Sequence, residues 1–257
     1  MKVVIIGSGN VAEALAVALT EAKVEVVQVY ARNAERGRAV AALAGAAWSD
    51  RELAVADLYL IAVSDRAVAE VAASLPLPEG AVVAHTAGCC PITALPEGAR
   101  RGVFYPFQTF TAGRRVDFRK LYIFIEADDE ATFEVLSALA HRLTDHVEQA
   151  DSARRAVVHL SGVFVNNFTN CLYADAAEIV ARVGLPFDVL APIAEETASK
   201  AAASGNPAAV QTGPARRGDE PTLERHRALL ADEPQLKDLY DKISENICRN
   251  VKTLKNC

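Results

Sequence analysis

The chain lacks features that several protein classes require. Only five of its 257 residues are cysteines, and their irregular spacing forms neither a disulfide framework nor a set of metal ligands. Cysteine use of this kind is typical of a reducing compartment, so we expect a cytoplasmic protein without a bound metal. The N-terminal sequence KVVIIGSGN also lacks the charged and then apolar pattern of a secretory signal.

Basic residues are also fewer than acidic residues. Lysine and arginine number 27 against 33 acidic residues, which gives a net charge of −6. The basic residues are scattered along the chain, so no nucleic-acid partner is expected. The longest stretch without a charged residue, 156–174, is barely long enough to cross a bilayer and contains three asparagines, so we expect no membrane span.

Residues 1–150 alternate short apolar runs with helical patterns, which is typical of a parallel sheet covered on both faces. Strands are predicted at 3–7, 24–31, 58–63, 81–86, 102–107, 121–127 and 146–150, and helices at 10–22, 33–45 and 129–143. Further on, helices are predicted at 151–183, at 186–203 and from 222 to the end, around a loop at 206–221. The predicted fold is α/β, a Rossmann-like doubly wound, mainly parallel sheet in residues 1–150, followed by a smaller all-helical domain in residues 151–257.

A glycine-rich turn follows the first predicted strand and opens the first helix. Its sequence GSGNVA matches the pattern G-x-G-x-x-A of dinucleotide-binding domains. In that pattern Gly7 permits the tight turn, Gly9 lets the backbone approach a pyrophosphate, and Ala12 keeps the helix close to the sheet. The predicted cofactor site also includes Ser8, Asn10 and Val11. The alternative is a tight turn that binds nothing.

The end of the second strand predicts which dinucleotide binds. NAD-binding domains carry an acidic residue there, whereas this chain has an arginine. Arg32 can hold a 2′-phosphate through two hydrogen bonds, with Arg36 one helical turn further on. We therefore predict NADP as the cofactor, held at this end by Ala31, Arg32, Asn33 and Arg36. The alternative is a solvated pair of arginines at a helix start.

The segment AVSD (62–65) follows the strand at 58–63. Ligands of open α/β sheets lie at the carboxyl ends of the strands, so Val63 and Ser64 are expected alongside the nicotinamide ribose. Asp65 is interpreted as the N-cap of the next helix rather than as a catalytic acid.

The motifs VVIIGSGNVAEAL, VYARN and AVSD, joined to a helical second half, resemble the superfamily of pyrroline-5-carboxylate reductase, 6-phosphogluconate dehydrogenase and the deazaflavin-dependent NADP reductases. Four further segments are similar to a group of NADP oxidoreductases in which a Rossmann-like domain precedes a helical domain of unknown function. These segments are HTAG (85–88), GVFYPFQTF (102–110), HLSGVFVNNFTNCLYADAAE (159–178) and QTGPARRGD (211–219). The resemblance implies the fold and an NADP cofactor, but no particular substrate.

The resemblance also implies roles for single residues. In the hydroxyacid dehydrogenases of the superfamily a Ser-Gly-Gly loop contacts the substrate, and Thr86 and Gly88 lie at the matching place. Their catalytic helix carries a lysine followed four residues later by an asparagine. Asn167 matches that asparagine, but Val163 stands at the lysine position, and residues 121–199 contain no lysine. The lysine acid–base chemistry of those enzymes is therefore not expected.

The uncharged stretch at 156–174 is expected to be a buried helix, although it contains many groups that need hydrogen-bond partners. At about 100° per residue, His159, Asn166 and Asn170 fall on one stripe, with Asn167 on its flank. Unpaired burial would cost about 1–3 kcal/mol per group, so we interpret the stripe as facing a polar ligand. His159 is the predicted general acid, because imidazole exchanges protons near neutral pH; the alternative is a histidine satisfied inside a dimer interface.

Further candidates follow predicted strands. His85 lies after an apolar strand and is the second candidate for the general acid. Gln108 and Thr109 follow the strand at 102–107 and are predicted to contact the substrate. The residues predicted to orient the substrate are Asn166, Asn167 and Asn170.

These patterns predict an NADP-dependent oxidoreductase that transfers hydride between NADP(H) and a small carbonyl, imine or hydroxy-acid-like substrate. The alternative is an NADP-binding sensor or scaffold without turnover, which the missing lysine motivates. Reduction of a bound deazaflavin is a third possibility, by analogy with the superfamily. The helical half carries more apolar surface than one layer can bury, which predicts a homodimer through it.

Overall fold

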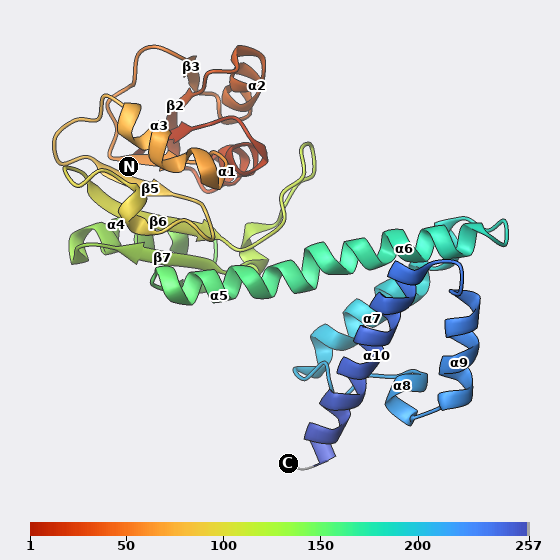
Figure 1. The fold of residues 1–257 in the computed structure, drawn as a ribbon. Helices are drawn as coiled ribbons and strands as arrows, with labels where there is room; N and C mark the ends of the chain where they lie inside the picture. Colours follow the sequence, from red (N-terminus) through yellow and green to blue (C-terminus); the bar gives the residue numbers. More distant parts are fainter. Residues whose placement is uncertain (256–257) are drawn as a thin grey trace. The chain divides into compact units, whose positions relative to one another are not determined.

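The structure is a computed structural model that describes the backbone of residues 1–255 and the side chains of residues 1–250. The chain divides into two compact units, Met1–Phe168 and a second that begins at Thr169. The first unit contains a sheet with helices on both faces, and the second is helical (Figure 1). The sheet ends at Gln149, next to the domain boundary predicted near residue 150, and the helix that follows belongs to the first unit as far as Phe168.

The sheet contains eight strands within the described residues, in the order β3-β2-β1-β4-β5-β6-β7-β8. They are β1 (Lys2–Ile6), β2 (Glu25–Tyr30), β3 (Ala47–Ser49), β4 (Leu58–Ile61), β5 (Val82–His85), β6 (Arg100–Pro106), β7 (Ile123–Ala127) and β8 (Val147–Gln149). Neighbouring strands are parallel except β6 and β7, which are antiparallel. The predicted doubly wound, mainly parallel sheet is therefore confirmed. The short strand β3 was not predicted, because three residues are too few to show an alternating pattern.

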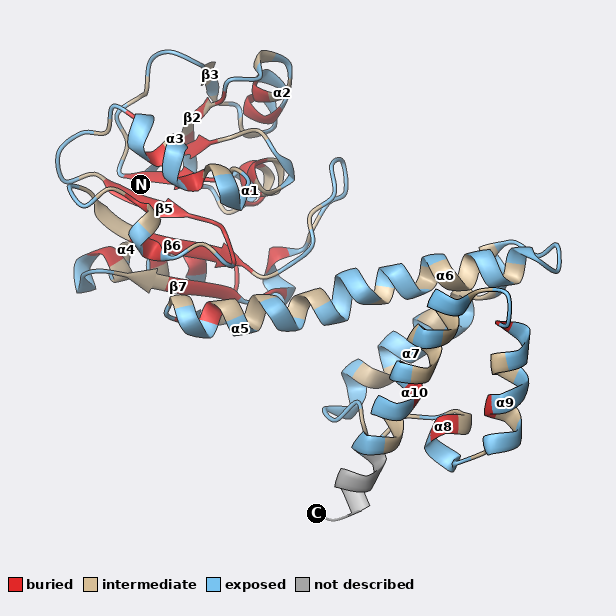
Figure 2. Ribbon diagram, viewed as in Figure 1, coloured by how far each residue is buried: buried red, intermediate tan, exposed pale blue. Residues whose placement is uncertain are grey.

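Helices cover both faces of the sheet. One face packs against α1 (Asn10–Glu21), α2 (Ala34–Ala44) and α4 (Glu130–His141), and the other against α3 (Val68–Ser74) and α5 (Ser152–Gly162). Alternate residues of β1 divide between the two layers: Val3 and Ile5 face the first, Val4 and Ile6 the second. Figure 2 shows the resulting core as a buried sheet between exposed outer helix faces. Each fully buried aliphatic side chain contributes roughly 1.5–3 kcal/mol to folding.

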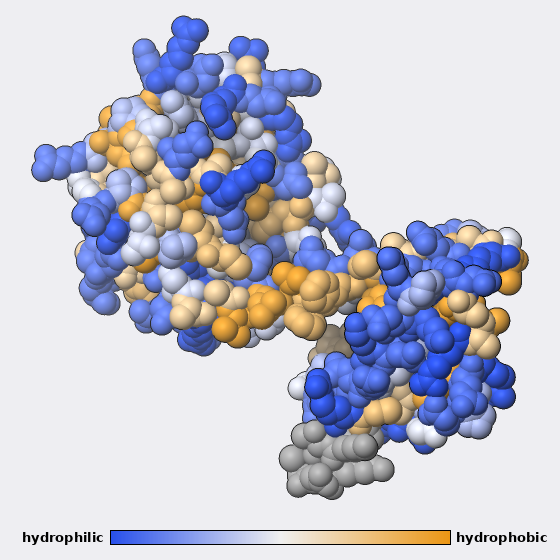
Figure 3. Space-filling view, in the orientation of Figure 1, coloured by the Kyte–Doolittle hydropathy of each residue, from blue (hydrophilic) through white to orange (hydrophobic). Residues whose placement is uncertain are grey.

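One long helical segment follows the sheet. It consists of α5, a π-helical turn (Val163–Phe168) and α6 (Thr169–Ala181), which confirms the extent of the helix predicted at 151–183. Its predicted burial is wrong: residues 163–181 include no buried side chain, and Arg155 is buried in α5. Many apolar side chains of this segment are exposed, although Val158 packs against the sheet, and Figure 3 shows an apolar surface along α5. The most exposed of them are Val157, Leu160, Phe164, Val165 and Phe168.

The second unit consists of helices. After α6 come a 3-10 turn (Phe187–Val189), α7 (Ala191–Ser204), α8 (Pro214–Arg217), α9 (Glu220–Leu229) and α10 (Pro234–Lys255). The helix predicted at 186–203 is therefore confirmed after an initial turn, and the loop predicted at 206–221 contains the short helix α8. The helix predicted from residue 222 is interrupted between α9 and α10, and its residues 256 and 257 lie outside the described residues. No helix among the described residues is long and apolar enough to cross a membrane.

Candidate active site

A cavity of about 890 Å³ opens at the carboxyl ends of β1 and β4. After β1 the chain turns to β2 on one side, and it later returns to β4 on the other, so the cavity lies at the switch point where ligands of doubly wound sheets bind. Its volume is within the range of small-molecule sites. The whole lining belongs to the first compact unit: Ser8, Gly9, Asn10, Val11, Ala62, Val63, Ser64, Asp65, Tyr105, Phe107, Gln108, Thr109, Phe110, His159, Ser161, Gly162, Val163, Val165, Asn166 and Asn167.

The glycine turn forms one wall of this cavity. Gly7 has φ +118°, and a Cβ on it would lie 2.4 Å from the carbonyl oxygen of Ala62, so only glycine fits between β1 and β4. A Cβ on Gly9 would meet no atom within 4 Å, which leaves open space before the first turn of α1. The free N–H groups of a helix start face an anion there, as the pyrophosphate of a dinucleotide requires. The turn therefore fits a dinucleotide.

The loop after β6 is fastened to the glycine turn. The side-chain amide of Asn10 donates to the carbonyl oxygen of Phe110 at 2.9 Å, and the backbone N–H of Gly113 donates to the Glu13 carboxylate at 2.7 Å. These bonds hold Gln108 and Thr109 in the cavity wall, where both were predicted. The Gln108 side chain accepts a hydrogen bond from the backbone of Thr109 at 2.9 Å, so its amide nitrogen is the group left to face a ligand.

The residues at the end of β2 lie beyond the cavity wall. Asn33 caps α2 by accepting a hydrogen bond from the backbone of Arg36 at 2.9 Å. Arg36 in turn donates to the carbonyl oxygen of Ser8 at 3.3 Å, which ties the start of α2 to the glycine turn. Arg32 is exposed, and its guanidinium makes no hydrogen bond or ion pair within the described part of the chain. A phosphate that extends from the glycine turn would meet it without a competing partner.

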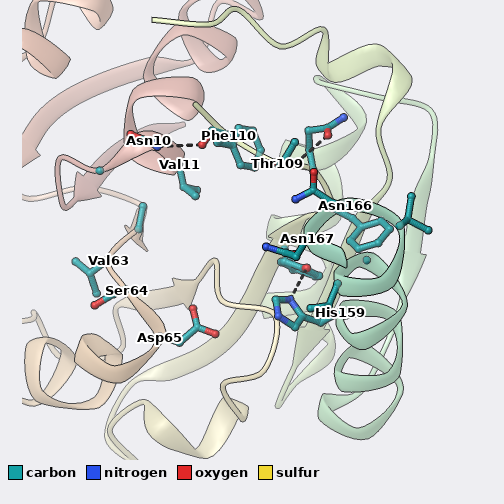
Figure 4. A pocket seen from close by; sticks show the side chains of 18 of the residues that line it. Asn10, Val11, Val63, Ser64, Asp65, Thr109, Phe110, His159, Asn166 and Asn167 are labelled. Carbon is teal, nitrogen blue, oxygen red and sulfur yellow. Dashed lines mark hydrogen bonds between the residues drawn. The ribbon is translucent and has the colours of Figure 1, made fainter. Parts of the chain in front are cut away.

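His159 lies on the wall opposite the glycine turn, as Figure 4 shows. Its Nδ1 lies 3.0 Å from the phenolic oxygen of Tyr105, a residue of β6 that sequence reasoning missed. Burial, followed by the nearby charges of Cys89 and Asp65, raises the pKa of Tyr105 to about 12, so the phenol stays protonated near neutral pH. Tyr105 therefore fixes the imidazole ring through Nδ1 and leaves Nε2 free to exchange a proton. The alternation of buried residues along GVFYPF was the available signal, since it gives Tyr105 the face opposite Phe104.

The π-helical turn decides which asparagines face the cavity. A π turn contains more residues than an α turn, so residues after it are rotated back relative to an uninterrupted α-helix. Asn166 and Asn167 both line the cavity with His159, although the α-helical pattern placed Asn167 on the flank. Asn170 lies in the second compact unit and is not part of the described wall.

Gly88 and Thr86 support this wall from behind. A Cβ on Gly88 would lie 2.4 Å from Nδ1 of His159 and 2.9 Å from the Tyr105 ring, so glycine is needed where the loop after β5 passes this pair. Thr86 is buried, and its hydroxyl donates to the carbonyl oxygen of Ile61 at 3.3 Å. Neither residue is among those that line the cavity.

A buried polar cluster joins α5 to the sheet. The Arg155 guanidinium forms an ion pair with Glu126 of β7 and donates to the carbonyl oxygen of Cys90. Ser152 donates to the same carboxylate at 2.9 Å and accepts from the backbone of Ile92 at 3.3 Å. Arg155 precedes His159 by one helical turn, so the cluster sets the position from which His159 enters the cavity.

His85, the second candidate for the general acid, is fully buried and is not among the residues that line the cavity. Its Nδ1 accepts a hydrogen bond from the backbone of Ala87 at 3.2 Å, while its Nε2 has no partner among the described residues. Burial, and then the positive charge of Arg155, lowers the pKa of His85 to about 4. The imidazole is therefore neutral near pH 7 and holds the loop after β5.

This depressed pKa predicts acid sensitivity. Above the ordinary pKa of 6.5, His85 is neutral in both the folded and the unfolded chain; below it, only the unfolded chain takes up the proton until about pH 4. We expect His85 to contribute a loss of about 3 kcal/mol in unfolding free energy as the pH falls from 6.5 to 4. Urea unfolding at several pH values, followed by the fluorescence of the single tryptophan, Trp48, measures this loss. In His85→Asn, whose amide oxygen can replace Nδ1, the unfolding free energy should fall less steeply as the pH decreases from 6.5 to 4. An unchanged pH dependence would contradict the assignment of this loss to His85.

Comparisons with known proteins agree with this fold and with the predicted cofactor. A family model described as NADP oxidoreductase coenzyme F420-dependent matches residues 2–88, and one described as a domain of unknown function (DUF2520) matches residues 121–247. A Bacteroides fragilis protein described as a "putative NADP oxidoreductase" is 39% identical, with 96% of this chain and 98% of that chain covered and a TM-score of 0.87. The chain therefore belongs to this family of NADP oxidoreductases, whose cofactor is NADP. No curated protein matches the chain.

More distant solved structures share the fold. An imine reductase from Streptomyces aurantiacus is 16% identical over 99% of both chains, with a TM-score of 0.67. A reductive aminase from Aspergillus terreus, in complex with NADPH and ethyl levulinate, is 16% identical over 98% of this chain and 99% of that chain, with a TM-score of 0.68. At this identity the likeness extends to the fold alone.

Proposed function

We propose that the chain reduces a carbonyl or imine carbon of a small substrate with NADPH, and that His159 supplies the proton. The observation that carries this proposal is that one cavity contains both the glycine turn and the His159–Tyr105 pair, on opposite walls. A substrate between them would have a hydride source on one side and an acid on the other. The imine and carbonyl chemistry of the distant relatives is consistent with such an arrangement.

The residues of the cavity have distinct parts in this reaction. When bound at the glycine turn, NADPH supplies a hydride to the electron-poor carbon. Nε2 of His159 gives a proton to the oxygen or nitrogen that becomes electron-rich, while Tyr105 keeps the ring in place through Nδ1. The amides of Asn166 and Asn167 orient the substrate, and the apolar side chains of Phe107 and Phe110 exclude water from it.

The reaction is tested by following NADPH absorbance with purified protein and a panel of ketones, aldehydes and cyclic imines. Oxidation of NADPH that requires both protein and one of these substrates supports the proposal. Tight NADPH binding without turnover on any member of the panel would favour the sensor or scaffold alternative instead.

The preference for NADP is assigned to Arg32, whose guanidinium is free to pair with the 2′-phosphate. Arg32→Ala is expected to weaken NADPH binding by roughly 10–100-fold, the equivalent of about 1.5–3 kcal/mol for hydrogen bonds to a charged group, with NADH binding unchanged. Calorimetric titration of both nucleotides measures the difference. Arg38→Ala is the matched control, because Arg38 lies on α2, which begins two residues after Arg32, and its guanidinium lies 4.6 Å from the centre of the Trp48 ring. If Arg32→Ala weakened NADPH and NADH binding equally, another group would have to bind the 2′-phosphate.

We further propose a homodimer, as the exposed apolar side chains along α5 and the π-helical turn suggest. A second copy that covers Leu160, Phe164 and Phe168 would remove them from water. Sedimentation analysis should then give twice the chain mass of 27.4 kDa.

The four described cysteines are unpaired, which fits the proposed reducing cytoplasm.

A further inference from the structure

The formal charge of the cavity wall comes from a single side chain among the described residues. The lining contains no lysine, arginine or glutamate, and Asp65 is its one aspartate. The other polar groups are hydroxyls and amides, with the imidazole of His159. A substrate with a carboxylate would therefore find no cation to pair with in the described wall and would meet the negative charge of Asp65.

Asp65 is the first residue of the 3-10 turn Asp65–Ala67. Ser64 occupies the N-cap position of the 3-10 turn Asp65–Ala67, so the N-cap role expected for Asp65 is wrong. Its carboxylate makes no hydrogen bond or ion pair within the described part of the chain. Asp65 is exposed toward the cavity, so the carboxylate is available to a ligand.

The carboxylate faces the proton-donating group. Figure 4 shows Asp65 after β4 on one wall and His159 with Asn167 on the opposite wall, directed toward the same space. The negative charge of Asp65 also extends across the cavity, because it contributes to the raised pKa of Tyr105, the partner of His159. The surfaces beside this space are apolar, from Phe107 and Val163.

We propose that Asp65 makes the site selective for a nitrogen that carries positive charge in the site, so that the substrate class is an imine that is protonated there and the product is an amine with apolar substituents. This inference rests on the proposed function and narrows its substrate from carbonyls, imines and hydroxy acids to imines. A carboxylate beside the C=N bond stabilises the iminium charge, and the apolar walls accept the substituents. Hydroxy acids and other carboxylates are excluded by the same charge.

The reaction balances with NADPH as the reductant. His159 gives a proton to the imine nitrogen, the new N–H bond forms, and Asp65 holds the resulting cation. The hydride then adds to the carbon, the electron pair of the C=N π bond becomes the nitrogen lone pair, and NADP⁺ is formed. His159 takes up a proton from water, so that one imine, one NADPH and one proton give one neutral amine and one NADP⁺. A second proton from water converts the amine to its cation.

Calorimetry with the NADP-loaded protein tests recognition apart from turnover. The probes are 2-phenylpyrrolidine, a cation at neutral pH, and 2-phenyltetrahydrofuran, its neutral isostere. The wild type should bind the amine more tightly, and Asp65→Asn should weaken amine binding by about tenfold or more while the ether is unaffected. Glu70→Gln is the matched control, since it removes the same charge from an exposed position of α3 outside the cavity. Failure of the wild type to prefer the amine, or equal amine affinity in Asp65→Asn, would overturn the proposal.

Kinetics with 2-phenyl-1-pyrroline and NADPH separate this inference from the proposed function. A fall of about tenfold or more in kcat/KM for Asp65→Asn, with NADPH affinity unchanged, supports both. Amine binding that depends on Asp65 without reduction of any imine would contradict the proposed function and leave the recognition by Asp65 supported. Reduction of the imine at the same rate in Asp65→Asn would overturn the role of Asp65 while the proposed function stands.

Discussion

His159→Asn is expected to lower kcat by about 10²–10⁴-fold, the usual contribution of a positioned acid. Asparagine can keep the hydrogen bond to Tyr105 but cannot exchange a proton, so the cavity wall should remain intact. NADPH affinity should not change, because the glycine turn lies on the opposite wall. Steady-state kinetics on an imine substrate, with calorimetric titration of NADPH, measures both quantities.

Two variants define this prediction further. Tyr105→Phe should lower kcat by less than His159→Asn, because the phenol acts through the imidazole and the proton donor is still present. Ser161→Ala is the control within the cavity: the Ser161 hydroxyl donates to the carbonyl oxygen of Val157 in its own helix at 3.0 Å, so turnover should be unchanged. Wild-type turnover in His159→Asn would show that another group, or water, supplies the proton.

Breaking the buried ion pair between Arg155 and Glu126 should produce the largest loss of stability. Arg155→Met leaves the Glu126 carboxylate largely buried without its cation, which costs about 3–5 kcal/mol of unfolding free energy. Urea unfolding followed by Trp48 fluorescence measures this loss for the first unit, because that unit contains the single tryptophan.

A neighbouring arginine provides the control. Arg154 is largely exposed and forms an ion pair with Glu148 at 3.6 Å, so Arg154→Ala should cost less than about 1 kcal/mol. The double variant Arg155→Met with Glu126→Leu should recover much of the loss, since it removes both charges. A cost for Arg155→Met no larger than that for Arg154→Ala would show that the buried pair does not stabilise the fold.

Local patterns were sufficient for the order of strands and helices and for the glycine turn. Four consecutive apolar residues before Gly7 predict a buried strand, and the spacing to Gly9 and Ala12 predicts the turn at its end. The missing acid at the end of β2 likewise indicates NADP from local sequence alone. The antiparallel direction of β7 and the brief strand β3 depend on long-range pairing, which no local pattern specifies.

The candidate site was only partly predictable. His159, Asn166 and Asn167, which line the cavity, were predicted because polar groups within an apolar helix need an explanation. Tyr105 was overlooked, because an aromatic residue in an apolar strand has the pattern of a core residue. Asp65 was interpreted as a cap, since a carboxylate before a helix usually has that role.

Spacing within short segments was enough to predict the doubly wound sheet, the dinucleotide turn and the helical second half. Which polar groups meet depends instead on how the elements pack. The π-helical turn brought Asn167 into the cavity wall, while packing buried His85 and joined Tyr105 to His159. Burial and distances between residues far apart in the chain depend on how whole elements pack, and this packing gives the cavity its acid and its negative charge.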